Sequence, residues 1–359
     1  MPQSQSNSNT EASLKSSPIA AFLKFIVPAV ISIGLCWMLF HNDSLDDMLA
    51  AIRTKCDFTI IGLMALLVFM SFVFRALRWG IQLRGVGVNA SFTELLYSIF
   101  GTYAVNLVIP RFGEIWRTGY IAHRREALFG TVFGTMVADR VADLITSMIL
   151  TLLTMLVGFK AISAFVHQYP DGYRHLLDIV TSPWTIILTA IIVIAAIIFF
   201  KSKSSNAMLY KTRNFAMELW TGFSAIIHIR QKGLWMLWTL MLWGCYFGEM
   251  YLAFQAFPFT REIMAEHGMA AVLVCFTLGT IAMGIPSNGG IGPYQIAIIF
   301  GLSLYSPAGA DEATQKAFEM DSKAFANIVL AISTLLTILT GLWAFIAIAT
   351  GKRKSRQAE

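Results

Sequence analysis

Two short charged motifs interrupt sequence that is otherwise apolar enough for a membrane. The first runs from Asn106 to Arg117 (NLVIPRFGEIWR) and follows an apolar run that is too short to cross a bilayer easily. The second runs from Asp139 to Asp143 (DRVAD). Ionisable groups at such positions are costly unless they pair with one another or bind a ligand. Both motifs are therefore candidate parts of one intramembrane binding site.

The first motif has the chemistry of a phosphate site. Arg111 and Arg117 carry planar guanidinium groups, which can bind phosphate through two parallel hydrogen bonds. Glu114 lies three residues before Arg117, the helical spacing at which its carboxylate can orient that guanidinium. The alternative is that the arginines only anchor the chain at the cytoplasmic face, as we expect of Arg124 and Arg125. That alternative explains Glu114 poorly.

The second motif contains more acid than base. Asp139 and Asp143 fall on one helix face, and Arg140 lies three residues before Asp143, so one ion pair and one surplus carboxylate are expected. The surplus carboxylate can carry a proton or hold Arg111 from the neighbouring segment. The alternative is a purely structural ion-pair network. Glu249, alone in a later apolar run, is either a further proton site or a hydrogen-bonded packing residue.

A second interrupted apolar segment lies near the other end of the chain. It contains Pro286 and, shortly after it, Gly289, Gly290 and Gly292. A broken helix leaves backbone donors or acceptors at membrane depth, and a ligand, water or side chains must satisfy them. The alternative is an ordinary loop just outside the bilayer. Two breaks at corresponding places favour the functional interpretation.

Composition classifies the chain as a polytopic membrane protein. Of its 359 residues, 56% are hydrophobic and 13% are charged, whereas about 25% are charged in soluble domains. The net charge of +6 comes from Lys and Arg in short loops, where membrane topology and anionic lipids explain it without nucleic acid. The histidines and cysteines lack metal-ligand spacing, and no GxxxxGK[ST] motif occurs, so we expect no metal and no cofactor.

The expected fold is all-α, with about six full crossings and two Pro/Gly-broken, re-entrant segments, or eight crossings if those segments span the membrane. Residues 1–19 are expected to be a disordered tail, 20–350 one transmembrane domain with an interfacial amphipathic helix over 206–230, and 351–359 a basic tail. An acidic loop over 311–321 is expected before the last crossing. The predicted crossings are Ala20–Phe40, Phe58–Trp79, Leu128–Phe159, Trp184–Phe200, Leu234–Phe257 and Ala324–Thr350, and the broken segments are Leu95–Ile109 and Met269–Ile285.

Charge distribution predicts the topology. With both termini in the cytoplasm, most Lys and Arg fall on the cytoplasmic side, in agreement with the positive-inside rule. Arg75 and Arg78, one helical turn apart near the end of the second crossing, can then snorkel or pair with lipid phosphate. The second and third crossings with the first break enter from outside, whereas the fifth and sixth crossings with the second break enter from inside. These two units are expected to be inverted repeats, an arrangement typical of transporters.

The order of these motifs resembles the flippase-like transmembrane family typified by the membrane half of lysylphosphatidylglycerol synthases. The residues that carry the resemblance are Arg78-Trp79, Asn106, Pro110 to Glu114, Arg117, Asp139-Arg140, Asp143 and Pro286 with Gly289, Gly290 and Gly292. Membership implies a multi-pass protein of a bacterial or archaeal inner (plasma) membrane. It also implies movement of a phospholipid or lipid-linked molecule between leaflets, with these residues along the headgroup path. No soluble aminoacyl-transfer domain occurs in this sequence, so lipid synthesis is not expected.

We therefore predict a lipid transporter that is not an enzyme and whose partners are membrane lipids. The candidate substrate-binding residues are Arg78, Asn106, Pro110, Arg111, Gly113, Glu114, Arg117, Asp139, Arg140, Asp143, Pro286, Gly289, Gly290 and Gly292. The candidate proton-coupling residues are Glu249, Asp139 and Asp143. Two alternatives use the same residues: a proton- or ion-coupled carrier of a small anion, and an accessory subunit that presents a lipid to a separate lipid-modifying transferase.

Overall fold

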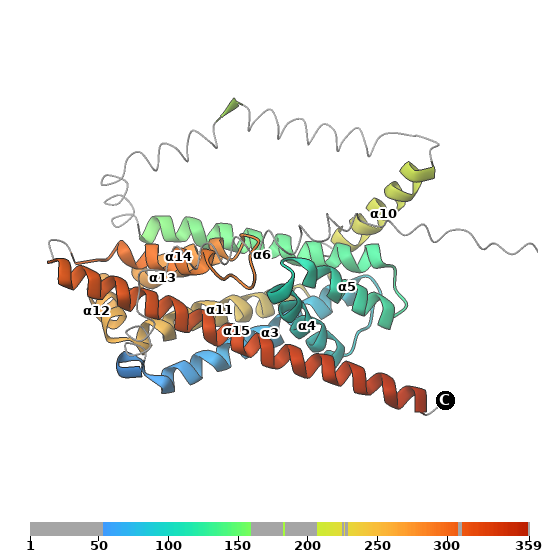
Figure 1. Cartoon of the computed structure of the whole chain (residues 1–359). Coiled ribbons are helices and arrows are strands. Elements are labelled where there is room, and N and C mark those ends of the chain that lie inside the picture. The colour runs from blue at the N-terminus through green and yellow to red at the C-terminus, as the bar shows by residue number, and fades with distance from the viewer. Residues whose placement is uncertain are drawn as a thin grey trace, which may run out of the picture.

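The computed structural model describes residues 53–158, 182–183, 207–224, 226, 229–307 and 311–357. All regular elements in these ranges are helices, which confirms the all-α class (Figure 1). They include α3 (Phe58–Gly85), α4 (Phe92–Val108), α5 (Phe112–Arg124), α6 (Phe129–Val157), α10 (Ala207–Ser224), α11 (Lys232–Ala256), α12 (Pro258–His267), α13 (Met269–Ala282), α14 (Pro293–Ser303) and α15 (Glu312–Gln357). The N-terminal tail and two predicted crossings, Ala20–Phe40 and Trp184–Phe200, lie outside the described residues.

Three of the described helices are long and apolar enough to cross a membrane. They are α3, α6 and the part of α15 from Glu312 to Thr350. Helices α12 and α13 would add a fourth span if the two together cross the membrane as a single segment, although they meet at an angle of 114°. The chain is therefore a membrane protein, while the total of six crossings stays a prediction. Helix α12 was not predicted, although Pro258 at its first turn is a typical start signal.

Both interruptions that the sequence predicts are present. Helix α4 ends at Val108 because a residue before proline is pushed out of the helical region, and Ile109 is extended with φ −127° and ψ 104°. Its 17 residues span about 26 Å, less than the roughly 30 Å hydrocarbon core of a bilayer. The second interruption separates α13 from α14. The re-entrant course of both segments stays a prediction.

Two hydrophobic cores lie at opposite ends of the bundle and share helices α3 and α15. The first half of α3 packs with α11, α13, α14 and the start of α15, around residues such as Phe254 and Phe325. The second half of α3 packs with α4, α5 and the later part of α15, around Trp79 and Phe100. Figure 1 shows α15 running along the whole bundle, with α4 and α5 at one end and α12 to α14 at the other. Each core therefore contains one of the two broken segments.

The predicted acidic loop before the last crossing is wrong, because α15 begins at Glu312 and has 46 residues. The backbone N–H of Thr314 donates to the Asp311 carboxylate, which supports the start of the helix. About two turns after Thr314, Asp321 pairs with Lys55 at 2.7 Å. Glu312 lies in the first turn of the helix, where the helix dipole favours negative charge.

A helix within the predicted amphipathic range 206–230 is present as α10, and it packs closely on α6. A Cβ added to Gly134 of α6 would overlap the carbonyl oxygen of Leu219, and one added to Gly222 of α10 would overlap that of Thr131. Small residues at such crossings let two helix backbones approach closely, as is common between membrane helices. The two glycines therefore define this contact.

Replacing Gly134 by Ala should destabilise the protein, because the new methyl group meets backbone atoms of α10 that cannot rotate away. We expect a loss of about 1–3 kcal/mol, the usual range for overpacking. Thermal unfolding in detergent measures it. The matched control is Gly62→Ala in α3, where an added Cβ meets nothing within 4 Å. Equal unfolding temperatures for the two variants would show that the α6–α10 contact is not close.

Candidate functional site

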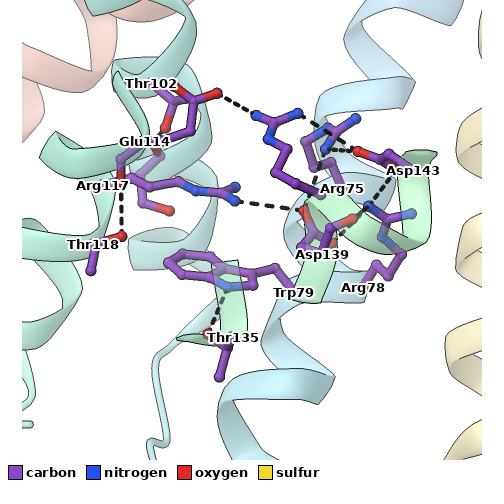
Figure 2. A network of polar contacts seen from close by, with 12 residues as sticks. Arg75, Arg78, Trp79, Thr102, Glu114, Arg117, Thr118, Thr135, Asp139 and Asp143 are labelled. Atoms are coloured by element: carbon purple, nitrogen blue, oxygen red, sulfur yellow. Dashed lines mark hydrogen bonds and ion pairs between the residues drawn. The ribbon is translucent and has the colours of Figure 1, made fainter. Parts of the chain in front are cut away.

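One network of ion pairs joins α3, α5 and α6 (Figure 2). Its members are Arg75 and Arg78 of α3, Glu114 and Arg117 of α5, and Asp139, Arg140 and Asp143 of α6. Four guanidinium groups face three carboxylates, so the network has one net positive charge. It unites the two charged motifs of the sequence and adds the arginine pair of α3.

The centre of the network is a double pairing between α3 and α6. Arg78 Nη2 lies 2.6 Å from Asp139 Oδ1 and 2.7 Å from Asp143 Oδ1. Arg75 Nη1 lies 2.8 Å from Asp143 Oδ2 and 3.4 Å from Asp139 Oδ2. The spacings i to i+3 on α3 and i to i+4 on α6 place each pair on one helix face, so the two faces meet. Arg78 and Asp139 are fully buried.

Arg117 is held by an aromatic ring and by the same aspartate. Its guanidinium lies 4.4 Å from the ring centre of Trp79, and its Nη2 lies 3.6 Å from Asp139 Oδ2. The indole N–H of Trp79 donates to Thr135 Oγ1 at 3.1 Å, which fixes the ring (Figure 2). A guanidinium over an aromatic face is attracted by the ring quadrupole, most strongly where water is excluded. Trp79 therefore positions Arg117, whose carboxylate partner is Asp139, and orientation of Arg117 by Glu114 stays a prediction.

Glu114 pairs with Arg140 of α6, whose Nη2 lies at 2.8 Å. The same carboxylate accepts a hydrogen bond from Asn106 Nδ2 at 3.2 Å, and Asn106 Oδ1 accepts from the backbone N–H of Gly113 at 2.8 Å. A Cβ on Gly113 would overlap the carbonyl oxygen of Thr102, so glycine permits this close approach of α4 and α5. The first motif thus forms a rigid corner that presents Glu114 to α6.

The two broken segments cap each other. Asn288, in the second break, donates to the last two carbonyls of α4 at 2.9 and 3.3 Å. Arg111, in the first break, donates to the carbonyls of Gly284 and, at 3.5 Å, Met283. Carbonyls at a helix end lack partners within the helix, so each break supplies what the other lacks. We call these contacts the reciprocal caps.

The reciprocal caps account for an unusual backbone. Arg111 has φ 65°, in the left-handed region that non-glycine residues rarely adopt. Such conformations persist where the surroundings fix them. The bonds of its guanidinium across to the second break provide that restraint. The predicted contact between Arg111 and the Asp139 carboxylate is therefore wrong, because that carboxylate is already taken by arginines 75, 78 and 117.

A cavity of about 970 Å³ lies against the network, between α3 to α6, α11, α13 to α15 and the second break. Most of its lining residues are apolar. Its charged lining residues are Arg75, Arg111, Glu114, Arg140, Asp143 and Glu249. The volume is that of a typical ligand pocket, which is mostly apolar with a few placed polar groups. Among the described residues, no group of three or more His, Cys, Asp or Glu is arranged to hold a metal.

The structure divides the candidate residues into two sets. Those on the cavity wall are Asn106, Arg111, Glu114, Arg140, Asp143, Glu249, Gly289 and Gly290. Those outside the wall are the buried Arg78, Arg117 and Asp139, and the backbone-shaping Pro110, Gly113, Pro286 and Gly292. Arg75, absent from the predicted set, is on the wall. The sequence feature that could have identified Arg75 is its position one helical turn before Arg78 in an apolar helix, which places both arginines on one helix face.

Buried ion pairs beside an apolar cavity, on membrane-spanning helices, define a polytopic membrane protein with a polar site among its helices. The family model of the lysylphosphatidylglycerol synthase TM region matches residues 25–318, so the chain belongs to this family. The protein is thus a membrane protein related to lipid metabolism or transport. Neither the curated proteins nor the solved structures contain a match to the chain.

Asp139→Asn should strongly destabilise the protein, because it removes the carboxylate that pairs with the buried Arg117 and one of the two that pair with Arg75 and Arg78. Breaking one partner of a buried ion pair costs about 3–5 kcal/mol, whereas surface pairs contribute at most about 1 kcal/mol. Chemical denaturation in detergent micelles measures the difference. Asp321→Asn is the control, since its partner Lys55 is 44% exposed. A similar, small effect of both changes would mean that the network does not hold α3 to α6.

Proposed function

We propose that this protein moves a phospholipid or lipid-linked molecule between the leaflets of the membrane and binds its anionic headgroup in the cavity. The observation that carries the proposal is the presence of Arg111 and Arg140 on a wall that is mostly apolar. A guanidinium group has five N–H donors. Arg111 is exposed, and the Arg140 side chain is 31% exposed, so both have donors left for a phosphate.

The buried arginines have a different role in this proposal. The side chain of Arg75 is 5% exposed, and those of Arg78 and Arg117 are fully buried and committed to Asp139 and Asp143. They hold the wall in place and leave it with net positive charge. The positive potential of the wall would attract a headgroup phosphate before contact. The phosphate would then replace water at the exposed guanidinium groups.

The apolar lining favours a lipid over a free small anion. A carrier for a small anion would need polar groups on all sides, whereas most residues that line this wall are apolar. Acyl chains of a lipid would remain in apolar surroundings during transfer. Glu114, Arg140 and Asp143 of the wall are arranged in ion pairs suited to binding a charged headgroup, so we propose a transporter and not an enzyme, one that can also supply lipid to a separate transferase.

We also propose the inverted-repeat topology, in a plasma membrane with both termini in the cytoplasm. Two observations support it: each hydrophobic core contains one broken segment, and the reciprocal caps join the two breaks directly. In transporters built in this way, substrate sites lie between the broken helices near the membrane midplane. In this proposal the cavity, which is lined by residues of both breaks, is the substrate site.

Arg111→Gln should slow transbilayer movement of phosphatidylglycerol about tenfold, the loss expected for one charge-assisted hydrogen bond. The measurement uses proteoliposomes with acyl-labelled lipid and a membrane-impermeant quencher. Arg84→Gln, at the exposed end of α3, is the control and should leave the rate unchanged.

Unfolding temperatures of both variants separate a lost contact from lost folding. Wild-type movement of phosphatidylglycerol by a folded Arg111→Gln variant would contradict headgroup binding by this residue.

A further inference from the structure

One acid on the cavity wall has no part in the headgroup contacts proposed above. Glu249 of α11 accepts a hydrogen bond from Ser333 Oγ of α15 at 2.7 Å. Within the ranges that the structure describes, it forms no ion pair, in contrast to the three network carboxylates. An ionised carboxylate at an apolar cavity is unfavourable unless a cation or several donors compensate it. The group is therefore placed to receive a cationic partner from the cavity.

Helix α11 connects this acid to the cationic network. Tyr246 lies one turn before Glu249 on the same helix face, and its hydroxyl accepts a hydrogen bond from Arg75 Nη2 at 3.1 Å. Tyr246, Glu249 and Ser333 all line the cavity. One helical turn is about 5.4 Å. Glu249 thus lies one turn along α11 from the tyrosine that contacts the network, and the cavity has arginines on one side and this carboxylate on another.

A ligand with both charges fits such a cavity better than an anion alone. The phosphate of a headgroup at the guanidinium groups would leave Glu249 unpaired, whereas a headgroup that also carries an amine would neutralise it. The rings of Tyr246 and Tyr294, which also line the cavity, offer aromatic faces that attract ammonium groups. Ser333 holds one carboxylate oxygen and leaves the other for the ligand.

Building on the proposed function, we propose that the transported lipid is zwitterionic, with a phosphate and a primary ammonium group in its headgroup, as in phosphatidylethanolamine. Arg111 and Arg140 bind the phosphate, and Glu249 binds the ammonium group. Glu249 is then a specificity-determining residue: it distinguishes lipids with an amine from lipids without one. The network arginines contribute equally to both kinds of lipid.

The test compares phosphatidylethanolamine and phosphatidylglycerol with the same labelled acyl chains in proteoliposomes. Wild-type protein should move phosphatidylethanolamine faster. Glu249→Gln, which keeps the size and the bond from Ser333, should slow phosphatidylethanolamine about tenfold and leave phosphatidylglycerol unchanged, since only one charge-assisted contact is lost. Glu262→Gln, at an exposed position of α12, is the matched control.

The outcomes separate this inference from the proposed function. Movement of neither lipid by folded wild-type protein would overturn both. Movement of phosphatidylglycerol with no preference for the amine, or with an equal loss of both lipids in Glu249→Gln, would overturn the inference and leave the transport function standing. An equal loss that also depends on a pH gradient would assign Glu249 to proton coupling. A selective loss of phosphatidylethanolamine would support the amine site.

Discussion

The buried pairing of Arg78 with Asp139 is the contact on which the site depends. Charges this deep in a helical bundle are tolerated only when they are paired, so α3 and α6 must meet at one register, with Asp143 and Arg75 in the same interface. That register brings Trp79 beneath Arg117 and thereby fixes α5 as well. The position of the cavity wall then follows from the crossing of these three helices.

The network therefore has a supporting layer and a working layer. In the supporting layer, the buried Asp139 pairs with Arg78 and Arg117, and these three side chains lie outside the cavity wall. In the working layer, Arg140 uses part of its guanidinium to hold Glu114 and presents the rest to the cavity. Preorganised groups of this kind need little rearrangement when a charged ligand arrives, because the surrounding protein has already fixed their geometry. The network has one net positive charge, so an anion is the complementary ligand.

Much of the fold could be predicted from the sequence, because the positions of helices and of their breaks depend on local sequence signals. Apolar runs, Pro110 and the glycines after Pro286 are sufficient to locate α4, α13 and both interruptions. The partners of the charged side chains could not be predicted in the same way. Spacing within one helix predicts a contact between Glu114 and Arg117, but packing between helices places Glu114 in an ion pair with Arg140. Asp321 likewise pairs with Lys55, which lies far away in the sequence. The residues next to Asp321 therefore did not reveal that it belongs to a helix.

The reciprocal caps have a consequence for how such a sequence can change over time. Asn288 completes a helix end more than a hundred positions away, and Arg111 does the same in the opposite direction. A substitution at either position leaves carbonyls without partners in the other half of the chain, where a local compensating change cannot reach them. The two halves are thus expected to covary at these positions, as two subunits do across an interface, although they belong to one polypeptide.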